Sequence, residues 1–463
     1  MRSPRRPATA AALAAPLAAV LAGGCAPAAR PSGAPAAATP APSAAAPTAS
    51  TTLTADETRM RDAVRAHYDA SIDLLARAVD IPSGTHNLAG VRRVGDLFAT
   101  ELQQLGFRTR WVDAPAGMRR AGHLVAEHPG QGARLLLIGH LDTVFEGDDQ
   151  KWVRQDTIAR GAGTGDMKGG DVAMVLALRA LKEAGQLERM HVTVIMTGDE
   201  EAPGQPIAAA RTTLTDLARA SDVALAFEGG SRSQISVTRR GSSSWTLEVK
   251  ARQAHSAGVF SEGAGYGAIY EGARVIDEFR RTLSGQPGLT FNVGLVGGGT
   301  AAATDTSLTR ITSEGKTNII APTFVARGDL RFLREAQKDS TRAAMRAIVA
   351  RPLNGATSTI TFTDGYPAMP ATDAGARLVA AFDGTSRALG YGAVQAQDAS
   401  SRGAGDVSFV APFIPGMDGL GVSGRGAHSP QESVSLPSLR MAAERAAVLM
   451  SRLSREWPRR PAS

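Results

Sequence analysis

Hydrophobic and polar positions follow two rhythms along this chain, and these divide most of it into helices and strands. Apolar residues three and four positions apart, such as Met60, Val64 and Tyr68, predict an amphipathic helix over 57–80, followed by a second helix over about 88–105. The predicted elements then run strand 107–112, strand 121–127, strand 133–138, helix 169–184, strand 190–196, helix 205–219 and strand 222–227. This order predicts an α/β fold with a mixed or parallel sheet between helices.

The pattern of hydrophobic and polar residues changes after about Gln234. Apolar and polar residues alternate over 242–251, which predicts a half-exposed strand. The elements expected next are a helix over 264–284, strands over 290–297, 316–320 and 323–332, a helix over 335–350 and a strand over 357–363. This β-α-β-β-α-β-like order predicts a small α+β sandwich inserted into the first domain. Helices over 374–389 and 436–453 complete the first domain, so we assign it residues 53–239 and 365–455, and the insert residues 240–364.

The N-terminal residues predict an export signal and a membrane anchor. Residues 1–24 have the basic start, apolar middle and small-residue end of an export signal, and Cys25 follows directly. This resembles a bacterial lipoprotein signal, which implies a lipidated Cys25; an ordinary export signal cleaved nearby is the alternative. Residues 25–52 are almost only Ala, Pro, Ser, Thr and Gly, which predicts a flexible tether. We therefore expect an exported, periplasmic, membrane-anchored lipoprotein.

Composition narrows the possible partners. Cys25 is the only cysteine, which excludes an internal disulfide. The net charge of +7 comes partly from arginines at the two extremes of the chain, and no dense basic patch with interleaved aromatic residues indicates nucleic acid. No later run reaches the length of a membrane span, so a lipid is the expected link to the membrane.

Acidic residues and histidines lie where apolar strands end or in glycine-rich loops. Open α/β sheets place their ligand sites at strand ends. The candidate ligands are His140, Asp142, Asp166, Glu200, Glu201, Glu228 and His428. Such nitrogen and oxygen donors suit a pair of zinc ions better than one structural zinc, which usually takes thiolates. The pattern therefore predicts a hydrolase.

Spacing suggests a role for several of these residues. Asp142 lies two residues after His140, so both side chains point to one side and the carboxylate can accept the second imidazole N–H; a simple turn cap is the alternative. Asp166 sits in a glycine-rich turn without the spacing of a phosphate loop, and we assign it as a bridge between two metals. Side chains of neighbouring residues diverge on extended backbone, so we assign Glu200 as general base and Glu201 as ligand; a solvated acidic surface is the alternative.

Two further residues are less specific taken alone. Glu228, after the apolar run V-A-L-A-F, is as compatible with a cap as with a ligand. His255 lies in the inserted domain and is a candidate hydrogen-bond donor that reaches over to the site, with a surface histidine as the alternative.

Together, H-L-D-T-V, G-D-M-K-G-G, D-E-E-A-P-G, F-E-G-G and A-H-S-P resemble the co-catalytic zinc peptidases. That family includes acetylornithine deacetylase, succinyl-diaminopimelate desuccinylase, glutamate carboxypeptidase and aminoacylases, and the resemblance covers nearly all of residues 55–453. It implies two zinc ions per subunit: His140 and Glu228 bind one, Glu201 and His428 bind the other, and Asp166 bridges. It also implies Glu200 as base, with Asp142 behind His140, and a glutamate at position 228 is similar to the carboxypeptidase branch.

The inserted domain resembles the lid and dimerisation domain of this family. A-R-Q-A-H-S-A-G is similar to the lid histidine motif, although Ser256 replaces the usual alanine and A-G-Y-G-A-I replaces a commoner Asn-Ala pair. T-N-I-I-A-P and G-D-L-R-F resemble the segment that binds the substrate carboxylate, which implies substrate contacts for Asn318 and Arg331. In relatives the lid histidine comes from the partner subunit, so the resemblance implies a homodimer in which His255 stabilises the oxyanion.

The sequence is therefore expected to encode a di-zinc exopeptidase that cleaves an amide or peptide bond next to a free carboxylate. The alternatives are an N-acyl-amino-acid deacylase or aminoacylase, and a non-catalytic metal-dependent binding lipoprotein; an intact Glu200 argues against the last. Arg232, Arg239 and Arg240 near the domain junction are candidates for favouring acidic substrates.

Overall fold

The computed structural model describes residues 52–305 and 308–461. The predicted signal at 1–24, the lipidation at Cys25 and almost all of the tether lie outside the described residues, so they stay predictions. Within the described part, no helix is both long and apolar enough to cross a membrane.

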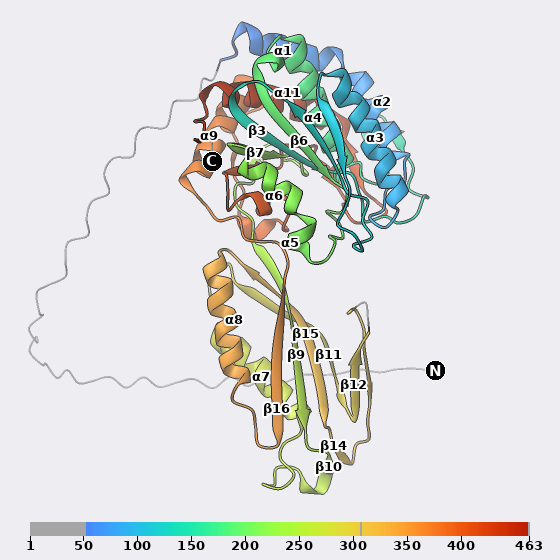
Figure 1. Cartoon of the computed structure of the whole chain (residues 1–463), viewed down its shortest axis with the longest axis vertical. Helices are drawn as coiled ribbons and strands as arrows, with labels where there is room; N and C mark the ends of the chain where they lie inside the picture. The colour runs from blue at the N-terminus through green and yellow to red at the C-terminus, as the bar shows by residue number, and fades with distance from the viewer. Residues whose placement is uncertain (1–51, 306–307, 462–463) are drawn as a thin grey trace, which may run out of the picture. The chain divides into compact units, whose positions relative to one another are not determined.

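A six-stranded mixed sheet forms the centre of the larger part of the chain (Figure 1). Its strands, in spatial order, are β1 (Arg108–Val112), β2 (His123–His128), β6 (Met190–Thr197), β3 (Gln131–His140), β7 (Val223–Ala226) and β18 (Gly416–Asp418). β3 runs parallel to β6 and β7, whereas β1 and β2 are antiparallel to their neighbours. The predicted α/β fold with a mixed sheet is confirmed.

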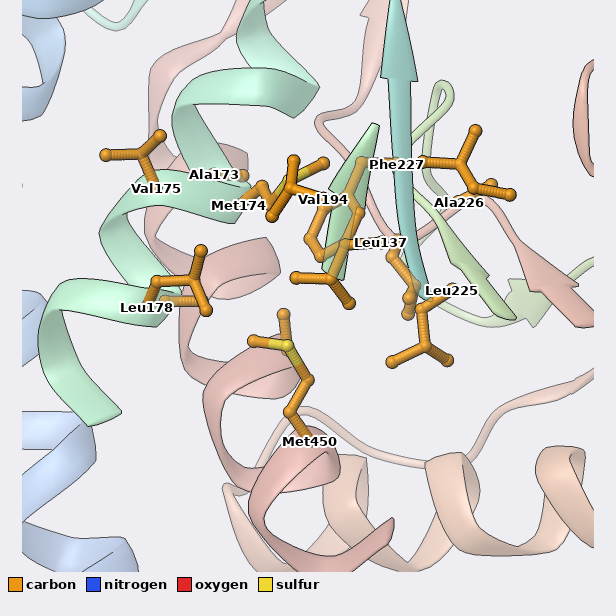
Figure 2. Packing of buried hydrophobic residues seen from close by; sticks show 14 of the residues in the cluster. Leu137, Ala173, Met174, Val175, Leu178, Val194, Leu225, Ala226, Phe227 and Met450 are labelled. Carbon is orange, nitrogen blue, oxygen red and sulfur yellow. The ribbon is translucent and has the colours of Figure 1, made fainter. Parts of the chain in front are cut away.

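Helices bury the faces of this sheet. They are α1 (Ala55–Ala66), α2 (Tyr68–Val79), α3 (Leu88–Gln104), α4 (Lys168–Glu183), α5 (Ile207–Ala210), α6 (Thr212–Arg219), α9 (Asp373–Ala388), α10 (Val407–Val410) and α11 (Leu436–Glu456). Figure 2 shows Leu178 of α4 and Met450 of α11 beside Leu137 of β3, within one buried apolar cluster. Burial of each such side chain contributes about 1.5–3 kcal/mol, so this cluster fixes the strands whose ends carry the candidate site.

Two predicted helices are each broken in the structure. The predicted helix over 57–80 is interrupted at His67, whose backbone (φ −98°, ψ 7°) leaves the helical region and whose ring contacts Glu183. The predicted helix over 205–219 is interrupted at Arg211, which has a similar backbone and a fully buried guanidinium. The apolar spacing continues through both breaks, so periodicity does not reveal them.

Residues 241–364 form a separate antiparallel sheet with its own apolar core. The strand order is β11 (Thr290–Gly299), β15 (Thr323–Phe332), β9 (Gly241–Ala251) and β16 (Ala356–Asp364), and the helices are α7 (Ala268–Leu283) and α8 (Glu335–Val349). Trp245 of β9 and Phe279 of α7 meet edge to face at 5.9 Å in this core. This arrangement contains the predicted sequence of strands and helices.

Strand β15 separates residues that the sequence placed together at the substrate. His255 ends β10 (Ala254–His255), which pairs with β14 (Ile319–Ile320), and the N–H of Ser256 donates to the carbonyl of Asn318 at 2.9 Å. His255 and Asn318 therefore lie together near the start of β15. Arg331 lies at the other end of β15, where the sheet joins the larger domain; eight residues of strand correspond to about 26 Å.

Several short strands complete the described structure. They are β4 (Val153–Gln155), β5 (Ile158–Arg160), β8 (Gln234–Ile235), β12 (Ala301–Thr304), β13 (Ile311–Glu314), β17 (Gln395–Ala396), β19 (Gly424–Arg425) and β20 (Ser433–Ser435), with 3-10 turns at Leu187–Arg189, Ser256–Gly258 and Ala399–Ser401. β19 and β20 belong to one small sheet with β5 and β4. The loop that connects β19 to β20 carries His428. These strands are too short for a periodic signal in the sequence.

Candidate metal centre

Three neighbouring parallel strands bring most of the candidate residues to one edge of the main sheet. His140 ends β3, the Glu200–Glu201 pair follows β6, and Glu228 follows β7. Asp166 lies just before α4, whose start packs very closely on the β7 side: a Cβ at Gly170 would lie 1.9 Å from the carbonyl oxygen of Phe227. Only glycine permits this approach, which brings Asp166 toward Glu228.

The five candidate ligands form two groups that share Asp166. One group is His140, Asp166 and Glu228, and the other is Asp166, Glu201 and His428; within each, the candidate donor atoms lie within 4.8 Å of one another. Asp166 Oδ1 lies 3.3 Å from His140 Nε2, while its Oδ2 lies 3.2 Å from His428 Nε2. The two carboxylate oxygens therefore face different groups, the arrangement that a bridging ligand requires.

The residues present fit divalent cations. Imidazole nitrogens and carboxylate oxygens are suitable zinc ligands, and Glu201 Oε1 is buried without a hydrogen-bond partner among the described residues. Burial, followed by the negative charge of Asp166, raises the pKa of Glu228 to about 8, and burial raises the pKa of Glu201 to about 7. Crowded, buried carboxylates of this kind are stabilised by a cation between them.

Asp142 contacts the site through both its backbone and its side chain. His140 Nδ1 lies 3.0 Å from the backbone carbonyl of Asp142 and 3.5 Å from its carboxylate. The carboxylate also accepts hydrogen bonds from the N–H groups of Glu200 and Glu201, at 3.0 and 3.1 Å, and from the Thr85 hydroxyl. Asp142 thus orients His140 through its backbone and fixes the Glu200–Glu201 turn through its side chain.

Glu200 rests on a buried polar frame that the sequence did not indicate. The Tyr366 hydroxyl donates to the carbonyl of Glu200 at 2.8 Å. Beneath the turn, the fully buried Arg211 pairs with Asp199 at 2.6 Å and with Asp406 at 2.7 Å. Asp199 is therefore occupied by an ion pair, whereas Glu200 has no ion pair within residues 52–305 and 308–461.

Glu432 joins the loops of Asp166 and His428. Its carboxylate accepts hydrogen bonds from the backbone N–H groups of Gly163, Gly165 and Asp166, at 3.2, 2.7 and 3.0 Å. Glu432 is not among the residues predicted from the sequence; the available signal was an acid four positions after His428 in a glycine-rich loop.

A cavity of about 470 Å³ opens over these groups, and all of its lining residues belong to the larger domain. The lining includes Asp166, Glu200, Glu201, Glu228 and His428 but not His255, Asn318 or Arg331. Arg331 instead pairs with Asp329 on its own strand at 2.9 Å. The substrate roles of these three residues stay predictions.

Comparison with known proteins identifies the family. Residues 136–452 match the model of peptidase family M20/M25/M40. The chain belongs to this family. It is 26% identical to carboxypeptidase G2 of Pseudomonas sp. (strain RS-16) over 384 residues, which cover 78% of this chain and 83% of that protein.

Solved structures agree on the fold. Aminopeptidase PepT from Bacillus cereus matches with a TM-score of 0.66 at 19% identity, over 84% of this chain and 99% of that one. The Bacillus subtilis YXEP protein, described as a dinuclear metal-binding peptidase of the M20 family, matches with a TM-score of 0.58 at 14% identity, over 84% and 99% of the two chains. The predicted family and its enzymatic class, a metallopeptidase or amidohydrolase, are confirmed, and M20 enzymes are metal-dependent, typically on zinc.

Proposed function

We propose that this M20 enzyme is an exported di-zinc exopeptidase that cleaves an amide or peptide bond next to a free carboxylate. The observation that carries the proposal is the division of the Asp166 oxygens between two ligand groups, with Glu200 beside them in the same cavity. The similarity to carboxypeptidase G2 favours the carboxypeptidase reading. Export and anchoring through Cys25 rest on the sequence alone.

His140 and Glu228 would hold one zinc ion, Glu201 and His428 the other, and Asp166 both. When bound, zinc supplies a Lewis acid for the scissile carbonyl and lowers the pKa of water. Glu200 takes one proton from the attacking water while the oxygen of that water adds to the carbonyl carbon. Glu200 then gives the proton to the amine nitrogen as the C–N bond breaks. The Asp142 and Tyr366 hydrogen bonds hold the backbone of Glu200 during both transfers.

We also propose that the 240–364 domain acts as a lid and dimerises. Thr323, at the start of β15, lies about 26 Å along the strand from Arg331, and His255 and Asn318 lie near that start. A small substrate therefore cannot contact both ends of β15 in one chain. In a homodimer, one subunit supplies Arg331 for the substrate carboxylate, and the other supplies His255 as an oxyanion donor and Asn318. This division gives each site a complete set of contacts.

The decisive experiment is a substrate screen with purified, zinc-reconstituted protein. N-acyl amino acids, dipeptides and folate-type glutamates are tested, each beside its C-terminal amide. Hydrolysis of peptidyl substrates that disappears in the amides supports the exopeptidase. A preference for acetyl or succinyl amino acids over peptides supports the deacylase, whereas binding without turnover supports the non-catalytic reading. Metal analysis should give about two ions per chain, and one ion that is insensitive to Asp166→Ala contradicts the bridge.

A further inference from the structure

Tyr366 lies in the connection between the larger domain and the inserted domain. The chain enters the insert through residues 239–242, at the start of β9, and leaves it through residues 365–369, just after β16 (Figure 1). These two linkers pair with each other, because Arg239 and Met369 exchange two backbone hydrogen bonds at 2.9 Å. The two crossings thus form one paired connection, and Tyr366 lies within it.

The backbone of Glu200 is held from two sides. Its N–H donates to Asp142 Oδ1 at 3.0 Å, and its carbonyl accepts the Tyr366 hydroxyl at 2.8 Å. Asp142 also contacts the candidate ligand His140, so one hold comes from the metal side and the other from the linker. The ring of Tyr366 packs on Phe409 of α10 with centroids 5.1 Å apart, which fixes the direction of the hydroxyl. A shift of the linker therefore reaches the base through one hydrogen bond.

Ser242 connects Tyr366 to the strand that carries Arg331. The Ser242 N–H donates to the Tyr366 carbonyl at 2.8 Å, and the Ser242 hydroxyl oxygen accepts the Tyr366 N–H at 3.1 Å. Its carbonyl accepts the N–H of Gly365 at 3.1 Å. Ser242 also lies directly opposite Arg331 in the pairing of β9 with β15. Three consecutive contacts therefore join Arg331, the residue assigned to the substrate carboxylate, to the backbone of Glu200.

We infer that Tyr366 is a positioning residue that links the binding of the substrate carboxylate at Arg331 to the placement of Glu200. Arg331 pairs with Asp329 at 2.9 Å, so a carboxylate that takes over the guanidinium changes the contacts at this end of β15. Ser242 and Tyr366 carry that change to the carbonyl of Glu200. The inference rests on the proposed function, in which Arg331 binds the carboxylate. Binding energy from a part of the substrate that does not react then serves to orient the base, which raises kcat.

A double-mutant cycle in zinc-loaded enzyme measures this link, with the most rapidly hydrolysed peptide of the substrate screen. Tyr366→Phe removes the hydroxyl and keeps the ring, so kcat should fall by about 2- to 10-fold with little change in KM. Arg331→Gln should raise KM and also lower kcat. In the double variant the loss of kcat should be smaller than the product of the two single losses, because both changes break the same link. Independent structural defects would multiply instead.

Hydrogen exchange gives a second readout that requires no turnover. Mass spectrometry follows the backbone amides of Glu200 and Glu201, both of which donate to the Asp142 carboxylate. Benzoate, a carboxylate without a scissile bond, should slow their exchange in zinc-loaded wild type. Tyr366→Phe and Arg331→Gln should each abolish this slowing, whereas an effect of benzoate through the metals alone would persist in both variants.

Tyr391→Phe is the matched control. The Tyr391 hydroxyl also donates a hydrogen bond of 2.8 Å, to the Glu444 carboxylate on α11, and neither of these two described residues lines the cavity. This variant should keep the wild-type kcat, KM and response to benzoate. Losses of kcat that multiply in the double variant, or a benzoate response that survives in Tyr366→Phe, overturn the inference.

Failure of the proposed function has a different signature. If the screen yields no hydrolysed peptide, the proposed function fails, and the exchange measurement alone decides the link. Slowing by benzoate in wild type that is lost in Tyr366→Phe supports the link, whereas exchange that benzoate does not change in wild type refutes it.

Discussion

The carboxylate of Glu432 accepts a hydrogen bond from the backbone N–H of Asp166 at 3.0 Å, and Glu432 follows His428 by only four residues. One side chain thus connects the shared candidate ligand to the loop of a second ligand. Residues behind metal ligands commonly set affinity by holding those ligands in place.

Glu432→Gln should therefore weaken binding of at least one zinc ion by about 10- to 100-fold. The two oxygens of Glu432 together accept three backbone N–H groups, whereas in the glutamine amide only the oxygen accepts and the NH2 group donates. Competition with a chromophoric chelator measures this affinity without reference to activity. Glu57→Gln is the control: the Glu57 carboxylate is also buried and accepts the backbone N–H of Thr54, but it pairs with Arg452 on α11. Equal zinc affinities for wild type and Glu432→Gln contradict the role of Glu432.

Glu200 and Glu201 should differ in the metal content of their variants. Glu200→Gln keeps the size of the side chain and removes the base, so zinc content should stay near two ions while kcat falls by about 10²–10⁴-fold. Glu201→Gln should lose one ion, and excess zinc should restore part of the activity. Atomic absorption measures the zinc content of each variant, and steady-state kinetics measure its kcat. The reverse pattern means that the roles are exchanged, and two active variants would remove both residues from the mechanism.

Subunits that lack different residues should complement each other if the lid serves a partner. His255→Ala and Glu200→Ala proteins, inactive alone, should regain activity after subunit exchange, because heterodimers hold one site with both residues intact. Sedimentation measures the dimer, and the recovered rate measures the intact sites. Full activity in a stable monomer is incompatible with a shared site.

Acid should weaken the contact between α1 and α11. Burial alone raises the pKa of Glu57, but hydrogen bonds from the Arg452 guanidinium and the Thr54–Glu57 capping box outweigh it, so the pKa lies below its usual 4.5. A carboxyl with a lowered folded-state pKa stabilises the fold above its unfolded-state pKa, and that stability is lost as pH falls through the folded-state value. Urea unfolding should therefore show a stability gap between wild type and Glu57→Gln at pH 7 that shrinks steadily below about pH 4.5. A gap independent of pH shows that Glu57 acts only through packing.

The sequence predicts the main sheet and the residues gathered at its edge because each follows an apolar run that is visible in one dimension. Predicting that His140, Glu200 and Glu228 lie together requires only the rule that neighbouring parallel strands end at the same edge of a sheet. Glu432 is marked only by its place four residues after His428, because its partners are backbone N–H groups, which no residue type identifies. The breaks at His67 and Arg211 also escape, since apolar spacing continues through them. The separation of Asn318 from Arg331 depends on the continuous extended strand β15 that lies between them.

The two ligand groups become complete at very different points of the chain. His140, Asp166 and Glu228 all precede β9, whereas His428 follows β16. A nascent chain that has emerged through residue 240 therefore holds every ligand of the first group but lacks His428 of the second. Translation of the whole intervening sheet must finish before the second group can close. Early truncation would thus leave a protein limited to one complete ligand group, with Asp166 no longer shared.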